Sequence, residues 1–215
     1  MAVVRILRVW GMWESEVADV LADLWGEGVR AAFQISDGEV QVRIAVSGLD
    51  PQEAAARADR IAAEASRRLG ESVFATDDQK VEDMVASLLV ERGWRVAIGE
   101  DLTAGSVANR LFVAHPEVLA AGVIRRTEVS PLAEAEELRR QVGAEVTLWV
   151  GPGTTTDRGT TRVEIGIVTP EGQLTDVFEY HGGPTAVRTV AAAAALHRLR
   201  RVLSSPAQGR RHSST

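Results

Sequence analysis

The segment GEDLTAGSVANRL, residues 99–111, combines two carboxylates, a threonine and a glycine at the start of an expected helix. Asp101 or Thr103 is the expected N-cap, because its side-chain oxygen can accept an amide hydrogen of the first turn. Free amides near Thr103 and Gly105 would then favour an anion such as phosphate. The alternative is that Glu100 and Asp101 only cap the helix, and their charge would repel a phosphate. The spacing favours the cap, since such caps are common. The residues expected on the inward face of this helix are Ala104, Val107, Ala108 and Leu111.

A second candidate segment is WVGPGTTTDRGTTRVEI, residues 149–165, a glycine-rich loop between two expected strands. Glycine lets the backbone approach a ligand closely, and successive amides can form an anion-binding nest. Gly151, Gly153 and Thr154 are therefore the candidate ligand contacts. The segment is not a P-loop, because the Gly-Lys-Ser/Thr ending is missing. The alternative is a hairpin loop of turn-forming residues, which the residue types alone slightly favour.

The remaining residue types predict neither a metal site nor an activated nucleophile. The chain has no cysteine, which excludes disulfides, zinc–thiolate sites and thiol catalysis. The four histidines, at positions 115, 181, 197 and 212, have no metal-ligand spacing to one another or to a carboxylate. Only His181, in YHGGP, is placed near a candidate site, and an ordinary loop residue is the favoured interpretation. Ser106 follows a glycine but lacks the nucleophile-elbow pattern.

The composition restricts the class of partner. The 215 residues carry a formal net charge of −6, which argues against nucleic acid or anionic lipid as the main partner. No apolar run reaches the length that a membrane span needs, and no signal-peptide pattern begins the sequence. The absence of cysteine fits a reducing compartment. We therefore expect a cytoplasmic protein with no membrane partner.

The first part of the chain is expected to form a small α+β domain over residues 1–75. An apolar run and a strictly alternating run indicate strands, and the spacing of apolar residues indicates two amphipathic helices. The turn residues SDG predict a hairpin. The expected elements are a strand at 3–10, a helix within 13–25 that buries Val17, Val20, Leu21, Leu24 and Trp25, hairpin strands at 30–35 and 40–46, and a helix at 50–70.

The second part is expected to form an α/β domain over residues 76–203, with a mixed sheet and flanking helices. Helices alternate with apolar strands first and hairpins follow, which is typical of a parallel sheet with an antiparallel edge. The continuous apolar run at 118–124 indicates a strand covered on both faces. The tail, residues 204–215, is polar and aperiodic and is expected to be disordered. The other expected elements are helices at 81–93, 131–143 and 184–203, and strands at 94–98, 146–150, 161–168 and 173–180.

The order of these segments resembles the C-terminal domain of the CinA (competence/damage-inducible) family, also called the nicotinamide-nucleotide amidase family. That family has a strand ending in A-E-S-C-T-G-G, a later G-V-V-A-Y-S-N-x-x-K segment, and a T-G-x-A-G-P-G-G loop before V-G-T-V. The stretches that correspond here are GEDLTAGSVANRL, AGVIRRTEVSP, WVGPGTTTDRG and TRVEIGIV. The N-terminal part, with LRVWGMWESEVADVLADL and EVQVRIAVSG, resembles the small KH-like domain that precedes it in longer members.

The resemblance implies an α/β fold, a homodimer and hydrolysis of nicotinamide mononucleotide to nicotinate mononucleotide and ammonia. It implies no metal or organic cofactor. Family members use the serine of A-E-S-C-T-G-G as the nucleophile. The tyrosine and lysine of Y-S-N-x-x-K support proton transfer and positioning.

This chain departs from the family pattern at all three of these positions. Asp101 takes the place of the serine, Arg126 takes that of the tyrosine, and the lysine position falls on or beside Pro131. Asp101 and Arg126 could form an ion pair across the pocket. Catalytic residues that act as a unit are strongly non-additive, so replacing them removes nearly the whole rate enhancement. The residues retained from the first motif are Glu100, Thr103 and Gly105.

Three functional hypotheses follow. The favoured one is a catalytically inactive CinA-type protein that keeps the fold and a pocket for a mononucleotide, with a structural or regulatory role. The second is an active hydrolase of nicotinamide mononucleotide or a related amide, with a site rebuilt around Glu100, Asp101, Thr103 and Arg126. The third is a nucleic-acid-binding module through the KH-like domain. The third is the weakest, because the acidic chain has no G-x-x-G loop in residues 1–74.

Overall fold

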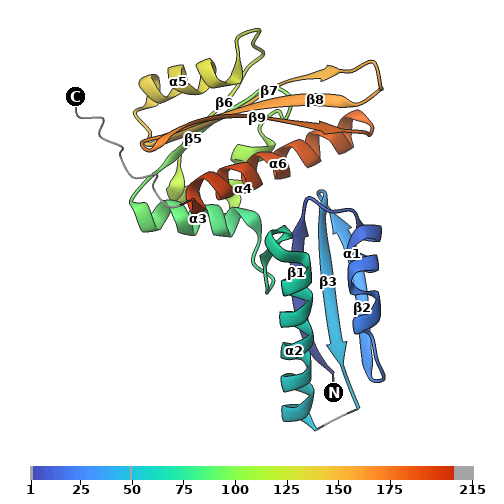
Figure 1. Ribbon diagram of the computed structural model, residues 1–215. Helices are drawn as coiled ribbons and strands as arrows, with labels where there is room; N and C mark the ends of the chain where they lie inside the picture. Colours follow the sequence, from blue (N-terminus) through green and yellow to red (C-terminus); the bar gives the residue numbers. More distant parts are fainter. Residues whose placement is uncertain (1, 49, 206–215) are drawn as a thin grey trace, which may run out of the picture. The chain divides into compact units, whose positions relative to one another are not determined.

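The computed structural model describes residues 2–48 and 50–205 (Figure 1). The chain forms two compact units, an N-terminal unit over Met1–Lys80 and a C-terminal unit from Val81 onward. The division falls just after the polar connector TDDQ at 76–79. Most of the tail that was expected to be disordered lies outside the described residues. None of the helices in the described part of the chain is both long and apolar enough to cross a membrane.

The N-terminal unit is a four-stranded antiparallel sheet with helices on one face, as the sequence predicts. The strand order is β2-β3-β1-β4. The short strand β4 was not predicted, because three residues carry too little periodicity to be recognised. The elements are β1 (Val3–Trp10), α1 (Glu14–Leu21), β2 (Val29–Ser36), β3 (Glu39–Val46), α2 (Pro51–Leu69) and β4 (Val73–Ala75).

Local chemistry explains these elements. Asp37 and Gly38 both have positive φ, at 56° and 82°, which is the geometry of the two-residue turn that joins β2 to β3. The Asp50 carboxylate caps α2 by accepting from the Gln52 N–H at 2.9 Å. Every second residue of β3 is buried against the helices, as the alternation predicts: Val40, Val42, Ile44 and Val46. Of the residues expected on the inward face of this helix, Val17 and Leu21 are buried and Leu24 and Trp25 are partly buried against the core, but Val20 is exposed.

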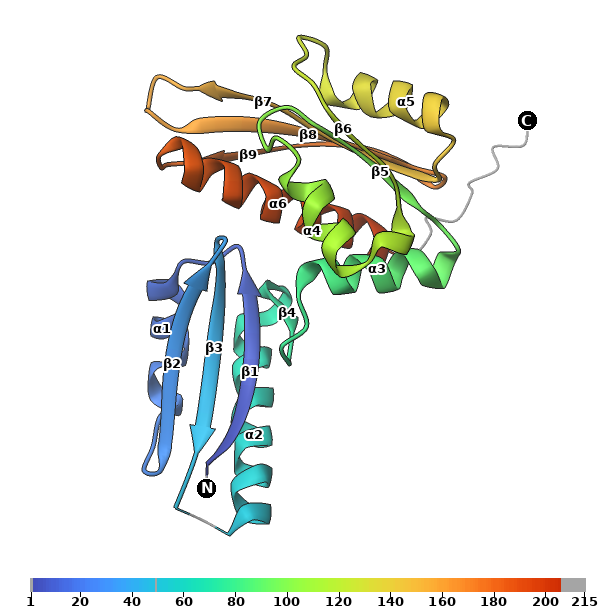
Figure 2. The same cartoon turned by 180° about the vertical axis from the view of Figure 1, so that it is seen from behind.

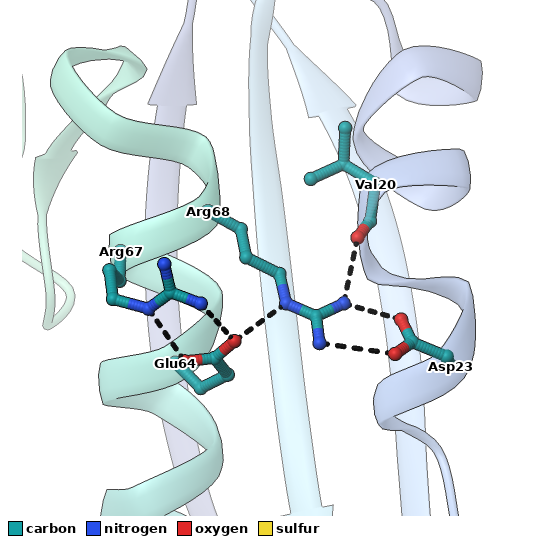
Figure 3. Close-up of polar contacts among 5 residues, drawn as sticks. All are labelled: Val20, Asp23, Glu64, Arg67 and Arg68. Carbon is teal, nitrogen blue, oxygen red and sulfur yellow. Dashed lines mark hydrogen bonds and ion pairs between the residues drawn. The ribbon is translucent and has the colours of Figure 1, made fainter.

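An exposed charge cluster joins the end of α1 to α2 (Figure 3). The Arg68 guanidinium donates to the Val20 carbonyl at 3.2 Å, to both carboxylate oxygens of Asp23, and to Glu64 at 2.8 Å. Arg67 donates to the same Glu64 carboxylate. The hydrogen bonds from Arg67 and Arg68 lower the pKa of Glu64 to about 2.

This cluster makes the N-terminal unit less stable in acid. Because the folded-state pKa of Glu64 is lowered, its contribution is present at neutral pH and is lost as pH falls from about 4.5 toward 2. We expect Arg68→Met to lower the melting temperature at pH 7. Near pH 2 the melting temperatures of the variant and the wild type should differ less. Circular dichroism melts across this pH range measure the effect. Arg60→Met, which replaces an exposed arginine on the same helix, is the control. If Arg68→Met lowers the melting temperature equally at pH 7 and near pH 2, the pH dependence does not come from Glu64.

The C-terminal unit is a five-stranded mixed sheet between two helical layers, which confirms the predicted α/β class. The strand order is β6-β5-β7-β8-β9; β5 pairs in parallel with β6 and β7, and the pairs β7–β8 and β8–β9 are antiparallel. Helix α5 covers one face, and α3, α4 and α6 cover the other (Figures 1 and 2). The elements are α3 (Val81–Arg92), β5 (Val96–Glu100), α4 (Ser106–Ala114), β6 (Leu119–Ile124), α5 (Pro131–Val142), β7 (Val146–Thr155), β8 (Thr161–Thr169), β9 (Gly172–Tyr180) and α6 (Pro184–Ser204).

Two expectations about this unit are wrong. The apolar strand β6 is not buried on both faces: it lies at the edge of the sheet, and the Ile124 side chain is 62% exposed. Its sequence, LAAGVI, contains no polar residue, so it resembles the sequence of a central strand although β6 lies at the edge. The strand expected at 146–150 does not end there either: β7 continues to Thr155 and pairs with β8, so the glycine-rich segment lies within a hairpin, the interpretation that its residue types slightly favoured.

Candidate functional site

A pocket of about 760 Å³ lies at the carboxyl ends of the parallel strands β5, β6 and β7. Loops that follow parallel strands meet at this edge of a sheet, which is where open α/β folds usually place their ligands. Three arginines and two acidic residues give the pocket a wall that carries both positive and negative charge. The lining residues are Asp101, Leu102, Ala104, Ile124, Arg125, Arg126, Thr127, Glu128, Pro152, Gly153 and Arg188.

Glu100, the last residue of β5, fixes the start of α4 from inside the protein. Its side chain is fully buried. One carboxylate oxygen accepts from the amides of Gly105 and Val107 at 3.0 and 3.1 Å, and the other accepts from that of Ala108 at 2.8 Å. The charge also opposes the helix dipole. The chain itself therefore occupies the position where an anion would meet this helix.

The predicted N-cap and inward face of this helix need correction. Neither Asp101 nor Thr103 is the N-cap: α4 begins at Ser106, and its N-cap is Gly105, with φ of 92° and no side-chain cap. Ala104 precedes the helix and is exposed, whereas Val107 and Leu111 are buried as predicted. Sequence spacing did not distinguish a cap within the turn from a carboxylate on the preceding strand.

Asp101 faces the pocket and is held by the loop that follows β6. Its Oδ2 accepts from the Thr127 N–H at 3.1 Å. The suggested ion pair with Arg126 is wrong: no ion pair links these two side chains in the described chain, although both line the pocket. The arginine that does form one is Arg125, which pairs with Glu134 of α5.

Arg125, Thr127 and Glu134 form a polar network behind the pocket. The Glu134 carboxylate is buried and accepts from the Arg125 guanidinium and from Thr127 Oγ1. Arg125 also lies over the Trp149 ring, 5.0 Å from its centroid, as a cation–π pair. The Thr127 hydroxyl accepts from the Val129 N–H at 3.0 Å, so its proton is committed to Glu134. This hydroxyl is placed to hold the loop after β6 and is not oriented as a nucleophile.

Pro131 and the predicted glycines have packing roles. Pro131 is buried and begins α5. A Cβ added to Gly151 would lie 2.6 Å from Pro131 Cγ, so the glycine admits the helix start against the sheet. A Cβ on Gly153 would lie 3.1 Å from Leu102 Cδ1, at the pocket wall.

The predicted ligand residues therefore separate into two groups. The pocket brings Asp101, Arg126 and Gly153 together. The others lie outside its lining: Glu100, Thr103, Gly105, Pro131, Gly151 and Thr154. Arg188 of α6 was missed, because it lies more than thirty residues from any predicted ligand residue and belongs to no motif.

None of the three histidines in the described part of the chain lines the pocket. His115 contacts Asp83 through Nε2 at 2.8 Å and Glu117 through Nδ1 at 3.5 Å. His181 is exposed beyond β9 and His197 is buried in α6, whereas His212 lies outside the described residues. Over residues 2–48 and 50–205 there is no cluster of three His, Asp or Glu side chains that could hold a metal ion.

The lysine and the tyrosine of the family pattern have no equivalent near the corresponding positions of this sequence. The only lysine in the chain is Lys80, in the N-terminal unit, and the only tyrosine is Tyr180, at the end of β9. Neither lines the pocket. The described lining thus offers carboxylates and guanidinium groups, and its single hydroxyl is that of Thr127.

These features define a two-unit α/β protein with a polar pocket beside the parallel strands of its second unit. Residues 4–75 match the family described as the damage-inducible protein CinA KH domain. A "CinA-like protein" of Frankia casuarinae is 30% identical over 93% of this chain and 54% of its own length. A "putative competence-damage inducible protein" of Desulforamulus reducens is 26% identical over 89% of this chain and 54% of its own length.

A solved structure supports the fold alone. The CinA superfamily protein of Escherichia coli has a TM-score of 0.51 and 20% identity, and the match covers 60% of this chain and 94% of that protein. The chain belongs to the CinA family. It spans about half the length of the curated relatives it matches.

Proposed function

We propose that this CinA-family chain binds a small phosphorylated ligand of the mononucleotide class in the pocket and does not hydrolyse its amide. The observation that carries the proposal is the lining itself, in which Arg126 and Arg188 accompany Asp101. Both guanidinium groups belong to exposed residues, and no described carboxylate pairs with them. Guanidinium groups suit phosphate oxygens because they donate several charge-assisted hydrogen bonds.

The same lining supports the proposed absence of hydrolysis. Attack on an amide needs an activated nucleophile and a base. Asp101 is a weak nucleophile toward an unactivated amide, and Thr127 already donates its proton to Glu134. The retained Glu100 carboxylate is occupied by the amides of α4. A cytoplasmic location, as expected from the composition, fits a nucleotide ligand.

Arg188→Ala tests the ligand side of the proposal. Loss of charge-assisted hydrogen bonds worth about 1.5–3 kcal/mol should weaken binding of nicotinamide mononucleotide by about tenfold to hundredfold. Ligand-dependent thermal shifts and calorimetry measure this, because binding to the folded state raises its melting temperature. Arg201→Ala, an exposed change at the far end of the same helix, is the matched control.

Two results would contradict the proposal. If nicotinamide mononucleotide, adenosine monophosphate and inorganic phosphate all fail to shift the wild type, the pocket is not a phosphate site. If Arg188→Ala and Arg201→Ala bind nicotinamide mononucleotide equally well, the ligand does not contact Arg188.

A further inference from the structure

The Glu134 carboxylate is buried near the start of α5, and its partners lie outside that helix. Glu134 is 5% exposed. The helix does not need it as a cap, because Ser130 already accepts from the Ala133 N–H at 3.3 Å. A buried carboxylate is costly unless it is paired and hydrogen-bonded, so its partners indicate its role. Both partners, Arg125 and Thr127, belong to the loop that follows β6.

These two partners are alternate residues of one extended segment. The Arg125 N–H donates to the Glu100 carbonyl at 3.0 Å, so the chain continues the pairing of β6 with β5 past the end of the strand. Side chains at alternate positions of an extended chain point to the same side. Arg125 and Thr127 therefore reach one carboxylate together, and Arg126 between them points to the other side. Glu134 thus holds the segment both before and after Arg126.

Arg125 itself is held in place, and its charge is compensated. Its guanidinium pairs with Glu134 and lies over the Trp149 ring, 5.0 Å from the centroid. Trp149 is 1% exposed and packs directly on β5, since a Cβ added to Gly99 would lie 1.9 Å from Trp149 Cε3. Arg126 is therefore the arginine of this loop that pairs with no described carboxylate and is available to a phosphate.

The second partner links Glu134 to the wall of the pocket. Thr127 donates its hydroxyl proton to Glu134, and its N–H donates to Asp101 Oδ2 at 3.1 Å. The Asp101 N–H donates in turn to the Val150 carbonyl of β7 at 2.9 Å. The segment around Arg126 is thus tied to α5 and, through Asp101, to β7. A binding group that is already ordered loses less conformational entropy when its ligand binds.

We propose that Glu134 is a positioning residue for the pocket: it holds Arg126 in the orientation that binds the phosphate of the ligand. Glu134 lies outside the described lining of the pocket, so it acts through Arg125 and Thr127. This role rests on the proposed function, because it requires a phosphorylated ligand in the pocket. A carboxylate that only stabilised α5 would change the melting temperature without acting through Arg126.

The test is calorimetric titration of the full chain with nicotinamide mononucleotide, using Glu134→Gln, Arg126→Ala and the double variant. Glu134→Gln keeps the shape of the side chain and removes its charge, so it should weaken binding by about tenfold, within the range for residues of one network. Arg126→Ala should weaken binding at least as much, and adding Glu134→Gln to it should change the dissociation constant by less than about twofold. Glu136→Gln, the same change at an exposed position of α5, should bind like the wild type.

Hydrogen exchange of the ligand-free protein gives a second readout, which does not need measurable binding. In Glu134→Gln the amide of Thr127 should exchange about tenfold faster, because the loop that carries it is held less firmly. The amide of Leu138, within α5, should keep its rate, which shows that the helix itself is intact.

The outcomes separate this role from the function on which it rests. If neither nicotinamide mononucleotide nor inorganic phosphate binds to the wild type, the proposed function is wrong and the positioning role with it. If the wild type binds, three results would overturn the positioning role alone. These are equal affinities of Glu134→Gln and Glu136→Gln, an undiminished effect of Glu134→Gln in the Arg126→Ala background, and an unchanged exchange rate of the Thr127 amide.

Discussion

Glu100→Ala is expected to destabilise the C-terminal unit by about 4 kcal/mol, since the buried carboxylate satisfies three amides at the start of α4. The variant leaves these donors without an acceptor and removes a charge that opposes the helix dipole. Glu100→Gln keeps an acceptor oxygen and should lose about half as much. Urea unfolding measures the free energy, and hydrogen exchange of Gly105, Val107 and Ala108 locates the change.

The control for this prediction is Glu91→Ala, an exposed carboxylate on α3 that should change stability by less than about 0.5 kcal/mol. A Glu100→Ala protein as stable as this control would mean that the carboxylate is not the acceptor of these amides. The retained glutamate of the first motif would then be available for another role.

Gly166→Ala is expected to cost about 3 kcal/mol, because α5 begins directly over this glycine of β8. An added Cβ would lie 2.4 Å from the Leu132 nitrogen and 2.5 Å from the Pro131 carbonyl carbon and oxygen. These are backbone atoms, so the clash is relieved only by moving the helix or the strand. The shift would also disturb the loop that carries Thr127 and the pocket wall. Urea unfolding and ligand binding should both weaken.

The comparison for this variant is Gly183→Ala, since no atom lies within 4 Å of a Cβ at that position. Its effect should stay within about 1 kcal/mol, the scale of a change at a helix N-cap, because Gly183 is the N-cap of α6. If Gly166→Ala unfolds at the same urea concentration as Gly183→Ala, α5 does not pack on β8 as described.

The elements of the fold could be predicted because their signals are local. The alternation in β3 and the Asp50–Pro51 start of α2 follow from neighbouring residues alone. The position of β6 in the sheet could not be predicted in this way. A run of small and apolar residues fits a central strand and an unprotected edge equally well, and the pairing order depends on contacts distant in the sequence.

The same distinction applies to the site. The segment that follows β5 was recognised, but the role of Glu100 depends on the return of α4 toward the strand end. Arg126 was identified from the family pattern, whereas Arg125 and its pairing with Glu134 became evident only once α5 was placed. Arg188 enters the pocket from the last helix, and no spacing rule connects it with residues near position 100.

The central claim is that the pocket keeps a phosphorylated ligand but has lost amide hydrolysis. The most direct measurement is ammonia release from nicotinamide mononucleotide by the pure chain, run beside a binding titration with the same ligand. We expect saturable binding and ammonia release equal to that of a heat-inactivated sample. Turnover clearly above that sample, and abolished by Asp101→Ala, would contradict the account and establish a rebuilt hydrolase.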